Sequence, residues 1–200
     1  MPSTTLLAVM TREADSRGLL IAERAGAVVF IAALTAAAAQ ISVPLPFTPV
    51  PFTFQPMVVL IGAMALGSRL GMTSQILYLT LGIAGLPVFA ASPTLPQGLG
   101  RLIGPTGGYL MAYPAAAFVA GWLAERGLDR RYLTSVAAMA CGLAIVFAGG
   151  VSWLGLFVDP ARGLTAALTA GFYPFIVADT LKLLAAALVL PRVWAFMGRR

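Results

Sequence analysis

The chain of 200 residues contains no histidine and no asparagine, and it has one cysteine and one lysine. Without histidine there is no Ser-His dyad, no usual general base and no common zinc site. The single cysteine, Cys141, excludes an intrachain disulfide and a thiolate metal cluster. It lies in the apolar run TSVAAMACGLAIVF, where we expect a small core residue. Neither a metal nor a bound cofactor is expected.

Charge is also scarce, because charged residues make up 10% of the chain and hydrophobic residues 60%. The mean hydropathy of +0.91 exceeds what a soluble core of this length needs and predicts an integral membrane protein. Long uncharged stretches, such as those between Arg24 and Arg69 and between Arg101 and Glu125, can each hold a span of about 20 residues. The net charge of +6 does not indicate nucleic-acid binding, because the arginines lie at the ends of apolar stretches and form no basic face.

The expected fold class is an all-α integral membrane protein with six transmembrane helices. A tail at residues 1–24, with a short interfacial helix, precedes a transmembrane domain at 25–191, and a second tail follows at 192–200. The expected spans are residues 25–43, 54–67, 70–86, 109–125, 133–157 and 164–189.

The arginines predict the orientation of these spans. Ten of them fall on the side of the termini, whereas only Arg101 and Arg162 fall opposite. By the positive-inside rule both termini are cytoplasmic, in a multi-pass protein of the cell inner membrane. The proline-rich segment 44–51 and the glycine-rich and proline-rich segment 85–108 would then lie outside, around an outward-facing cavity.

The last expected span carries an acid and a base, Asp179 and Lys182, in an otherwise apolar run. At i and i+3 on a helix the two side chains share one face. Each charge near the middle of a bilayer costs about 2.5–3.5 kcal/mol on insertion scales. The pair is therefore either a structural ion pair between helices or a polar ligand site inside the bundle. Because Lys182 is the only lysine and follows no glycine-rich run, the chain lacks a P-loop for ATP.

Four separated motifs resemble one known family. In order along the chain they are PLPFTPVPFTFQ at 44–55, GLPVFA at 85–90, GPTGGYL at 104–110 and DTLK at 179–182. Over about residues 25–190 the chain resembles the biotin-specific substrate-binding subunits, the BioY family, of energy-coupling factor (ECF) transporters. The resemblance implies a six-helix S-component, not an enzyme, that captures biotin outside. It would deliver biotin inward with a transmembrane coupling (T) component and two cytosolic ATPase subunits.

The resemblance also implies ligand-binding residues. Asp179 and Lys182 match the family's Asp-x-x-Lys motif, Gln55 ends the proline-rich motif, and Tyr109 begins the fourth span. Family members also use an asparagine, which this chain lacks, so that either Gln75 or Tyr78 takes its place or the polar contact to the ligand differs.

The chemistry of biotin agrees with a carboxylate and an ammonium on one face. Its cyclic urea offers two N–H donors and one carbonyl acceptor, and apolar walls would take the thiophane ring and the valeryl chain. In the opposite pose Lys182 would meet the ligand carboxylate, and both poses stay open.

Small residues on the first span predict a partner surface. Ala32 and Ala36, with Ala33 and Ala37, form small-xxx-small faces that let another helix approach closely. Such alanines on the first helix resemble those of the surface through which S-components contact the T-component. The alternative is that this face packs inside the six-helix bundle. Membrane lipid is an expected partner, and self-association is left open.

Two other functions compete with vitamin capture. A self-contained ion-coupled carrier for a small polar metabolite or another vitamin would use Asp179 to bind protons, but the halves of the chain show no inverted repeat. An intramembrane enzyme is disfavoured, because the chain has no histidine for a serine mechanism and no second intramembrane carboxylate for aspartyl catalysis.

Overall fold

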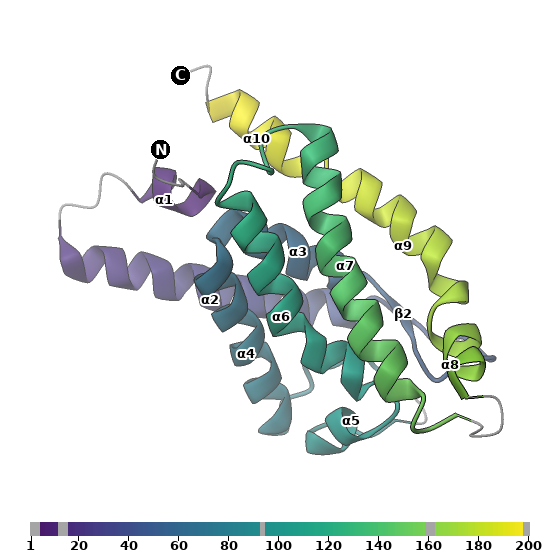
Figure 1. Cartoon of the computed structure of the whole chain (residues 1–200). Coiled ribbons are helices and arrows are strands. Elements are labelled where there is room, and N and C mark those ends of the chain that lie inside the picture. The colour runs from purple at the N-terminus through teal and green to yellow at the C-terminus, as the bar shows by residue number, and fades with distance from the viewer. Residues whose placement is uncertain (1–4, 12–15, 93–94, 159–162, 198–200) are drawn as a thin grey trace.

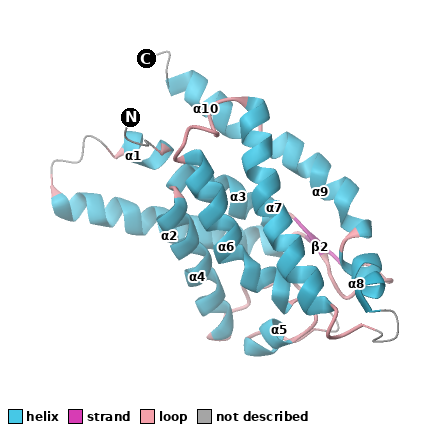
Figure 2. Ribbon diagram, viewed as in Figure 1, coloured by secondary structure: helices cyan, strands magenta, loops and turns pink. Residues whose placement is uncertain are grey.

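The computed structural model describes residues 5–11, 16–92, 95–158 and 163–197. Over these ranges the chain is helical apart from loops and one short strand pair (Figures 1 and 2). The elements are α1 (Leu6–Met10), α2 (Arg17–Gln40), β1 (Ser42–Val43), β2 (Phe52–Thr53), α3 (Gln55–Leu66), α4 (Ser68–Ile83), α5 (Leu99–Ile103), α6 (Gly107–Ala124), α7 (Tyr132–Leu154), α8 (Gly163–Gly171), α9 (Tyr173–Ala186) and α10 (Val189–Met197).

Helix α6 is the centre of the bundle and packs against α3, α4 and α7. Its small residues permit this close packing. Gly121 lies against the backbone of Gly67 and Ser68, and Gly108 lies against Trp153 and the backbone of Gly149. A side chain at either glycine would collide with main chain, so both contacts depend on glycine.

Helix α2 lies at the side of the bundle. It crosses α4 and α6 at a steep angle, and its N-terminal half projects beyond them (Figure 1). Its inner face buries Val28, Ile31, Thr35 and Ala39 against α3 and α4. Ser16 begins the helix as an N-cap, because its side chain accepts a hydrogen bond from the amide of Leu19.

Five of the six expected spans correspond to one helix each, and the sixth is broken. The chain leaves the helical path at Phe172, where Pro174 in the first turn of α9 has no amide hydrogen to continue the helix of α8. Within the residues that the structure describes, three stretches are long and apolar enough to cross a membrane, namely 17–40, 132–154 and 173–197. Helix α3, with 12 residues, extends about 18 Å at 1.5 Å per residue, well short of a bilayer core of about 30 Å.

The proline-rich segment is the loop of a β-hairpin. Ser42 pairs with Thr53 and Val43 with Phe52, so the two strands meet just outside the prolines. The helix before the hairpin is tied to the segment after α4, since Gln40 donates to the carbonyls of Pro87 and Phe89. The proline-rich segment 44–51 is thus closed at its base by strand pairing.

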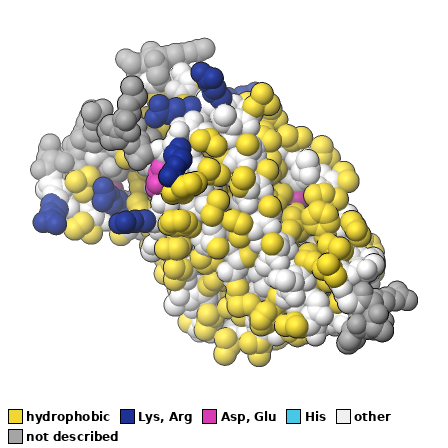
Figure 3. Space-filling model, viewed as in Figure 1, with side chains coloured by type: hydrophobic (Ala, Val, Ile, Leu, Met, Phe, Trp, Pro, Cys, Tyr) yellow, Lys and Arg dark blue, Asp and Glu magenta, His cyan; other side chains and the backbone are white. Residues whose placement is uncertain are grey.

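Helices α1 and α10 lie at the same end of the molecule, opposite α5 and the hairpin (Figure 1). The visible surface shows many hydrophobic side chains, and its basic side chains gather near α1, α10 and the start of α2 (Figure 3). This distribution is typical of a protein whose sides face lipid and whose one end faces a basic-rich aqueous side.

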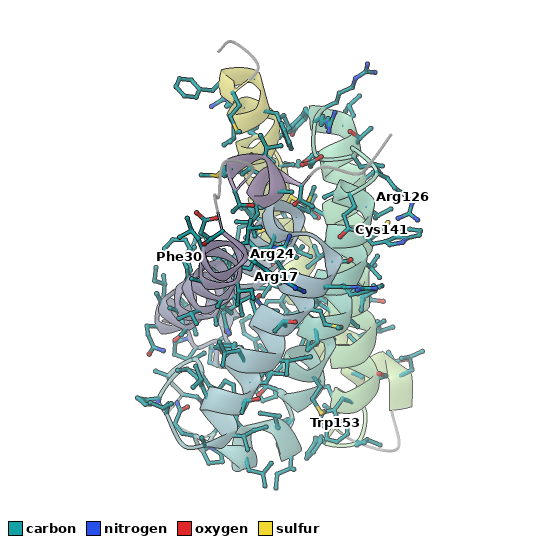
Figure 4. The ribbon with its side chains drawn as sticks, turned by 90° about the vertical axis from the view of Figure 1, so that its left-hand side faces the viewer. Arg17, Arg24, Phe30, Arg126, Cys141 and Trp153 are labelled. Carbon is teal, nitrogen blue, oxygen red and sulfur yellow. The ribbon has the colours of Figure 1, made fainter. Side chains whose placement is uncertain are left out.

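Two expectations from the sequence change in the structure. Cys141 is exposed on α7 rather than part of the core, because the outward face of a membrane helix is as apolar as its inward face (Figure 4). The boundaries drawn at 24/25 and 191/192 fall inside α2 and α10, so helix continues from the transmembrane domain into both proposed tails.

Candidate functional site

A cavity lies between the hairpin and the helices α3, α6, α7 and α9. Its volume, counted as the space open to the centre of a water-sized molecule, is about 60 Å³. Most of the wall is apolar, with a few polar groups that converge from distant parts of the chain. The lining residues are Val50, Pro51, Thr53, Gln55, Pro56, Phe89, Ala90, Arg101, Thr106, Tyr109, Leu110, Tyr113, Val146, Phe147, Phe175 and Asp179.

Asp179 faces this cavity from the middle of α9 and is only 6% exposed. Its Oδ1 forms an ion pair with the ammonium of Lys182, one helical turn further along. Lys182 does not line the cavity. Its ammonium also donates to the backbone carbonyl of Thr53, at 2.7 Å, and lies 3.8 Å from the centre of the Phe52 ring. The two residues are together, as the sequence predicts, but only the carboxylate faces the cavity.

Gln55 enters the cavity from the first position of α3 and is held by a chain of hydrogen bonds. Its Nε2 donates to the hydroxyl of Tyr78 at 2.6 Å, and that hydroxyl donates to the carbonyl of Val88 at 3.2 Å. Tyr78 is fully buried behind Gln55 and lies outside the cavity wall. Because no donor among the described residues meets the amide oxygen of Gln55, this oxygen can accept a hydrogen bond from a ligand.

Tyr109 and Thr106 form the wall at the start of α6. The hydroxyl of Tyr109 donates to the carbonyl of Gly171 at 2.7 Å, so its ring faces the cavity while its polar end ties α6 to α8. The hydroxyl of Thr106 is buried and has no partner among the described residues. A buried unpaired hydroxyl costs stability, and a ligand that fills the cavity would satisfy it.

Arg101 is a cavity residue that sequence reasoning missed, because it was counted only as an outside charge. Its side chain is 2% exposed and forms three hydrogen bonds to backbone carbonyls, from Nη2 to Ala90 and Leu95 and from Nε to Pro96. Burial lowers the pKa of Arg101, while the nearby Tyr78 opposes this shift. An arginine still keeps its charge at neutral pH, so a cation faces the cavity. Its position as the only charge between Arg69 and Glu125 was the available signal.

Gln75 is not brought to the cavity. Its Nε2 donates to the hydroxyls of Thr35 and Ser74, between α2 and α4. This contact fastens α2 to the bundle. Of the two side chains expected to replace the missing asparagine, only Tyr78 is linked to the site, through Gln55.

The four alanines expected to form a partner surface divide between two faces of α2. Ala32 is 2% exposed and packs inside the bundle, whereas Ala33 and Ala37 are exposed and Ala36 is half-buried. Figure 4 looks nearly along α2 and shows Phe30 on the side away from the other helices. The outward face therefore contains Ala33, Ala37 and Phe30.

The cavity is suited to holding a molecule with an apolar body and polar ends. A carboxylate from α9 and a guanidinium from α5 supply opposite charges, while Gln55 and Thr106 offer neutral hydrogen-bonding groups. Among the described residues, no group of three or more cysteine, aspartate or glutamate side chains could hold a metal ion. The arrangement favours binding over chemistry.

Comparisons with known proteins agree with this geometry. A model of the BioY family matches residues 10–199. A probable biotin transporter BioY of Pyrococcus horikoshii is 39% identical over 172 residues, which cover 86% of this chain and 96% of the relative. The biotin transporter BioY of Thermotoga maritima is 40% identical over 161 residues, or 80% of this chain and 89% of the relative.

One solved structure shares the fold. It is the S-component for biotin from an ECF-type ABC transporter, which superposes with a TM-score of 0.76 at 23% sequence identity. The alignment covers 90% of this chain and 94% of the other. Nearly the whole described bundle therefore has a counterpart of known structure.

Proposed function

The chain belongs to the BioY family, and we infer from this membership that it binds biotin as the substrate-specific subunit of an uptake system. It is a transport protein and not an enzyme. The observation that carries this conclusion is the family match over residues 10–199, together with a cavity that has polar groups at separate points of its wall.

We propose that the chain acts as an S-component, with a T-component and two cytosolic ATPases as partners. The shared fold with an S-component for biotin supports this role. The absence of a P-loop from the sequence agrees with ATP hydrolysis by separate subunits. Because biotin uptake would then need ATP, the ion-coupled alternative predicts a different energy source.

The cavity favours one of the two ligand poses left open by the sequence. Arg101 is the cation that faces the cavity, whereas the ammonium of Lys182 is turned to Asp179 and Thr53. We therefore place the valeryl carboxylate of biotin at Arg101, because a charge-assisted hydrogen bond from a guanidinium to a carboxylate is strong. Asp179 would accept the N–H groups of the cyclic urea. Gln55 and Thr106 would add neutral hydrogen bonds, and Tyr109 and Phe147 would flank the apolar body.

We propose that six membrane crossings are made by α2, α3, α4, α6, α7 and the α8–α10 segment. The shared end of α1 and α10, and the basic side chains gathered there, support a cytoplasmic location for both termini (Figure 3). The hairpin and α5 would then face outside, and the membrane would be the cell inner membrane. A cysteine at Arg130 that reacted with an impermeant maleimide on intact cells would overturn this orientation.

The outward face of α2 is our proposed surface for the T-component. Ala33 and Ala37 leave room for a second helix at close range, and van der Waals packing is the main attraction between helices in lipid. Ala32 is excluded from this surface by its burial. Ala36 lies at its edge.

The function is tested by the ligand that the protein retains. We expect biotin to copurify with the detergent-solubilised chain, and uptake in cells to require the ATPase partners and to persist with a proton uncoupler. Uptake that stopped with the uncoupler and needed no ATPase would favour the ion-coupled carrier.

The site is tested by removing its charges. We expect Asp179→Asn and Lys182→Ala each to weaken biotin binding while the protein still inserts and folds. Breaking one member of a buried pair also leaves its partner unpaired, so part of the loss reflects stability. In the double variant a purely structural pair would recover both stability and binding. Lost binding in a stable double variant supports the site.

A further inference from the structure

A second pocket lies at the α1 end of the molecule, between α1, α2 and the turn that joins α3 to α4. The first half of α2, which projects beyond the bundle, borders it (Figure 1). Its volume, counted as the space open to the centre of a water-sized molecule, is about 310 Å³. It shares no lining residue with the cavity beside the hairpin, so it is a separate feature that the proposed function does not use.

Two guanidinium groups line this second pocket from different helices. Arg24 lies on α2 and Arg69 in the first turn of α4, and both side chains are exposed. Among the described residues, neither guanidinium forms a hydrogen bond or an ion pair. Guanidinium groups form strong, charge-assisted hydrogen bonds with phosphate oxygens. The two arginines therefore offer a phosphate group donors that the protein itself does not occupy.

A carboxylate also lines the second pocket, but the protein already uses it. Oε1 of Glu125 accepts hydrogen bonds from the amide and the hydroxyl of Ser68, each at 2.8 Å. These bonds hold the carboxylate at the start of α4, where the helix dipole stabilises a negative charge. With two guanidinium groups against one carboxylate, the pocket keeps a positive charge. The hydroxyl of Thr5, which accepts from the amide of Ala8, still has its own proton to donate to an anion.

An apolar seam between α2 and α4 begins at the same pocket. Leu66 and Leu70 line the pocket next to Arg69. Half-buried Ala27, Leu70 and Leu77 pack around the small core that α2 and α3 share. Leu77 lies about two helical turns after Leu70, so the seam runs along α4 away from the arginines. A basic pocket that continues into an apolar seam has the two parts that a phospholipid needs, one for its headgroup and one for an acyl chain.

We propose that the second pocket binds an anionic phospholipid of the phosphatidylglycerol class, with its phosphate at Arg24 and Arg69 and one acyl chain along the α2–α4 seam. The single negative charge of this lipid matches the positive charge of the pocket, whereas choline and ethanolamine headgroups add a cation beside the arginines. The site does not depend on biotin. The proposed orientation matters only for its leaflet, which is then the cytoplasmic one.

Thermal unfolding in a neutral detergent tests the site, because a lipid that binds the folded chain raises its melting temperature. Phosphatidylglycerol should raise it, and phosphatidylcholine with the same acyl chains should not. Arg24→Gln with Arg69→Gln should melt like the wild type without lipid. This double variant should bind phosphatidylglycerol about 25-fold more weakly, or about fivefold for each arginine near an anionic lipid.

A matched control removes the same charge outside the pocket. Arg126 and Arg192 are exposed and do not line the pocket, and Figure 4 shows Arg126 well apart from Arg24. Arg126→Gln with Arg192→Gln should keep the wild-type affinity for phosphatidylglycerol. Equal losses in the two double variants would show attraction to the overall charge of the protein and would overturn the proposed site.

Two measurements on the wild type identify the ligand and its place. Inorganic phosphate at the same concentration should not stabilise the chain, because it has no acyl chain for the seam. If it stabilised the chain as much as phosphatidylglycerol did, the ligand would be a soluble anion and the lipid proposal would be wrong. Phosphatidylglycerol with a photoreactive acyl chain should cross-link to peptides that contain Leu70 and Leu77. Cross-links spread evenly over the exposed faces of α7 and α9 would show only a general lipid coat and would also refute it.

Discussion

Helices α2 and α6 are both rich in glycine and alanine, yet the protein uses their small residues in opposite ways. Ten of the 18 residues of α6 are buried, against six of the 24 residues of α2. On α6 the glycines are covered, as Gly121 is by the backbone at Gly67. On α2, a Cβ added at Gly26 would meet no atom within 4 Å.

The difference shows that small residues in a membrane helix indicate where another helix can approach closely, but they do not identify that helix. In lipid there is no hydrophobic gain from burying apolar surface against another helix, so the quality of packing decides which helix faces meet. The small residues of α6 are occupied by neighbours from the same chain. Those on the outer face of α2 remain open for a partner, and the following predictions test this contrast.

The largest effect is expected where a side chain would replace a glycine contact on α6. Gly121→Val should prevent stable folding or destabilise by more than about 3 kcal/mol, because its Cβ would collide with the backbone of Gly67 and Ser68. The matched variant Gly26→Val should fold normally, since the space around it is open. Thermal unfolding of the detergent-solubilised variants measures both. Equal losses of stability would remove the contrast between the two helices.

The next effect separates two adjacent residues of α2. Ala32→Trp should cost about 1–3 kcal/mol, because Ala32 is buried and its pocket cannot hold an indole. Ala33→Trp should keep stability and biotin binding while abolishing co-purification of the T-component and ATP-dependent uptake. Ala36→Trp should lie between them.

Both outcomes for the α2 variants are informative on the same samples. If Ala33→Trp lost folding and binding together, the outer face would pack inside the bundle. If it still assembled with the T-component, the proposed surface would lie elsewhere.

A smaller effect is expected where α7 fastens the start of α6. The indole nitrogen of Trp153 donates to the carbonyl of Gly104 at 2.9 Å, just before α6. Trp153→Phe should lower stability by about 1 kcal/mol through the loss of this hydrogen bond. Trp122→Phe, at an exposed ring that stacks with Arg126, serves as the control and should change stability less. A larger loss of stability in Trp122→Phe than in Trp153→Phe would contradict the stabilising role of the Trp153 hydrogen bond.

The smallest effect concerns the loop after α6. Asp129 is buried there and accepts a hydrogen bond from the indole of Trp194 on α10. Burial raises the pKa of Asp129, and the Trp194 bond opposes this shift. A raised acid pKa contributes stability at pH values below the ordinary pKa, and that contribution is lost as pH rises through the raised value. As pH falls from neutrality towards the ordinary carboxyl pKa, the wild type should therefore gain stability, by less than about 1 kcal/mol, relative to Asp129→Asn. If the melting temperatures of the wild type and Asp129→Asn changed by the same amount across this pH range, Asp129 would not titrate there.

Much of the bundle could be predicted because charge is expensive in lipid. The gaps between charged residues located α3, α4, α6 and α7 to within a few residues, whereas α2 begins eight residues before its expected start. Four motifs predicted the family. The break at Phe172 was not predicted, since an apolar run of this length looks continuous and a proline in the first turn of a helix is common.

The site was predicted less completely, because the sequence does not show in which direction each side chain points. Sequence spacing places Asp179 and Lys182 on one face, but it cannot tell which of them faces a cavity and which faces a hairpin. Arg101 looked like a surface charge because it lies in a loop, and its burial depends on carbonyls at Ala90, Leu95 and Pro96 that only the folded loop brings together. Gln75 was polar enough for a ligand but serves the contact with Thr35.

The bare outer face of α2 has a consequence for assembly. In water, an exposed apolar face would drive association or aggregation, whereas in a bilayer its contact with acyl chains costs little. The unattached subunit is then a stable species, and the fraction in complex follows mass action among the copies present in the membrane. We therefore expect its association with a partner to be reversible, so that an excess of a competing subunit would displace it without unfolding it.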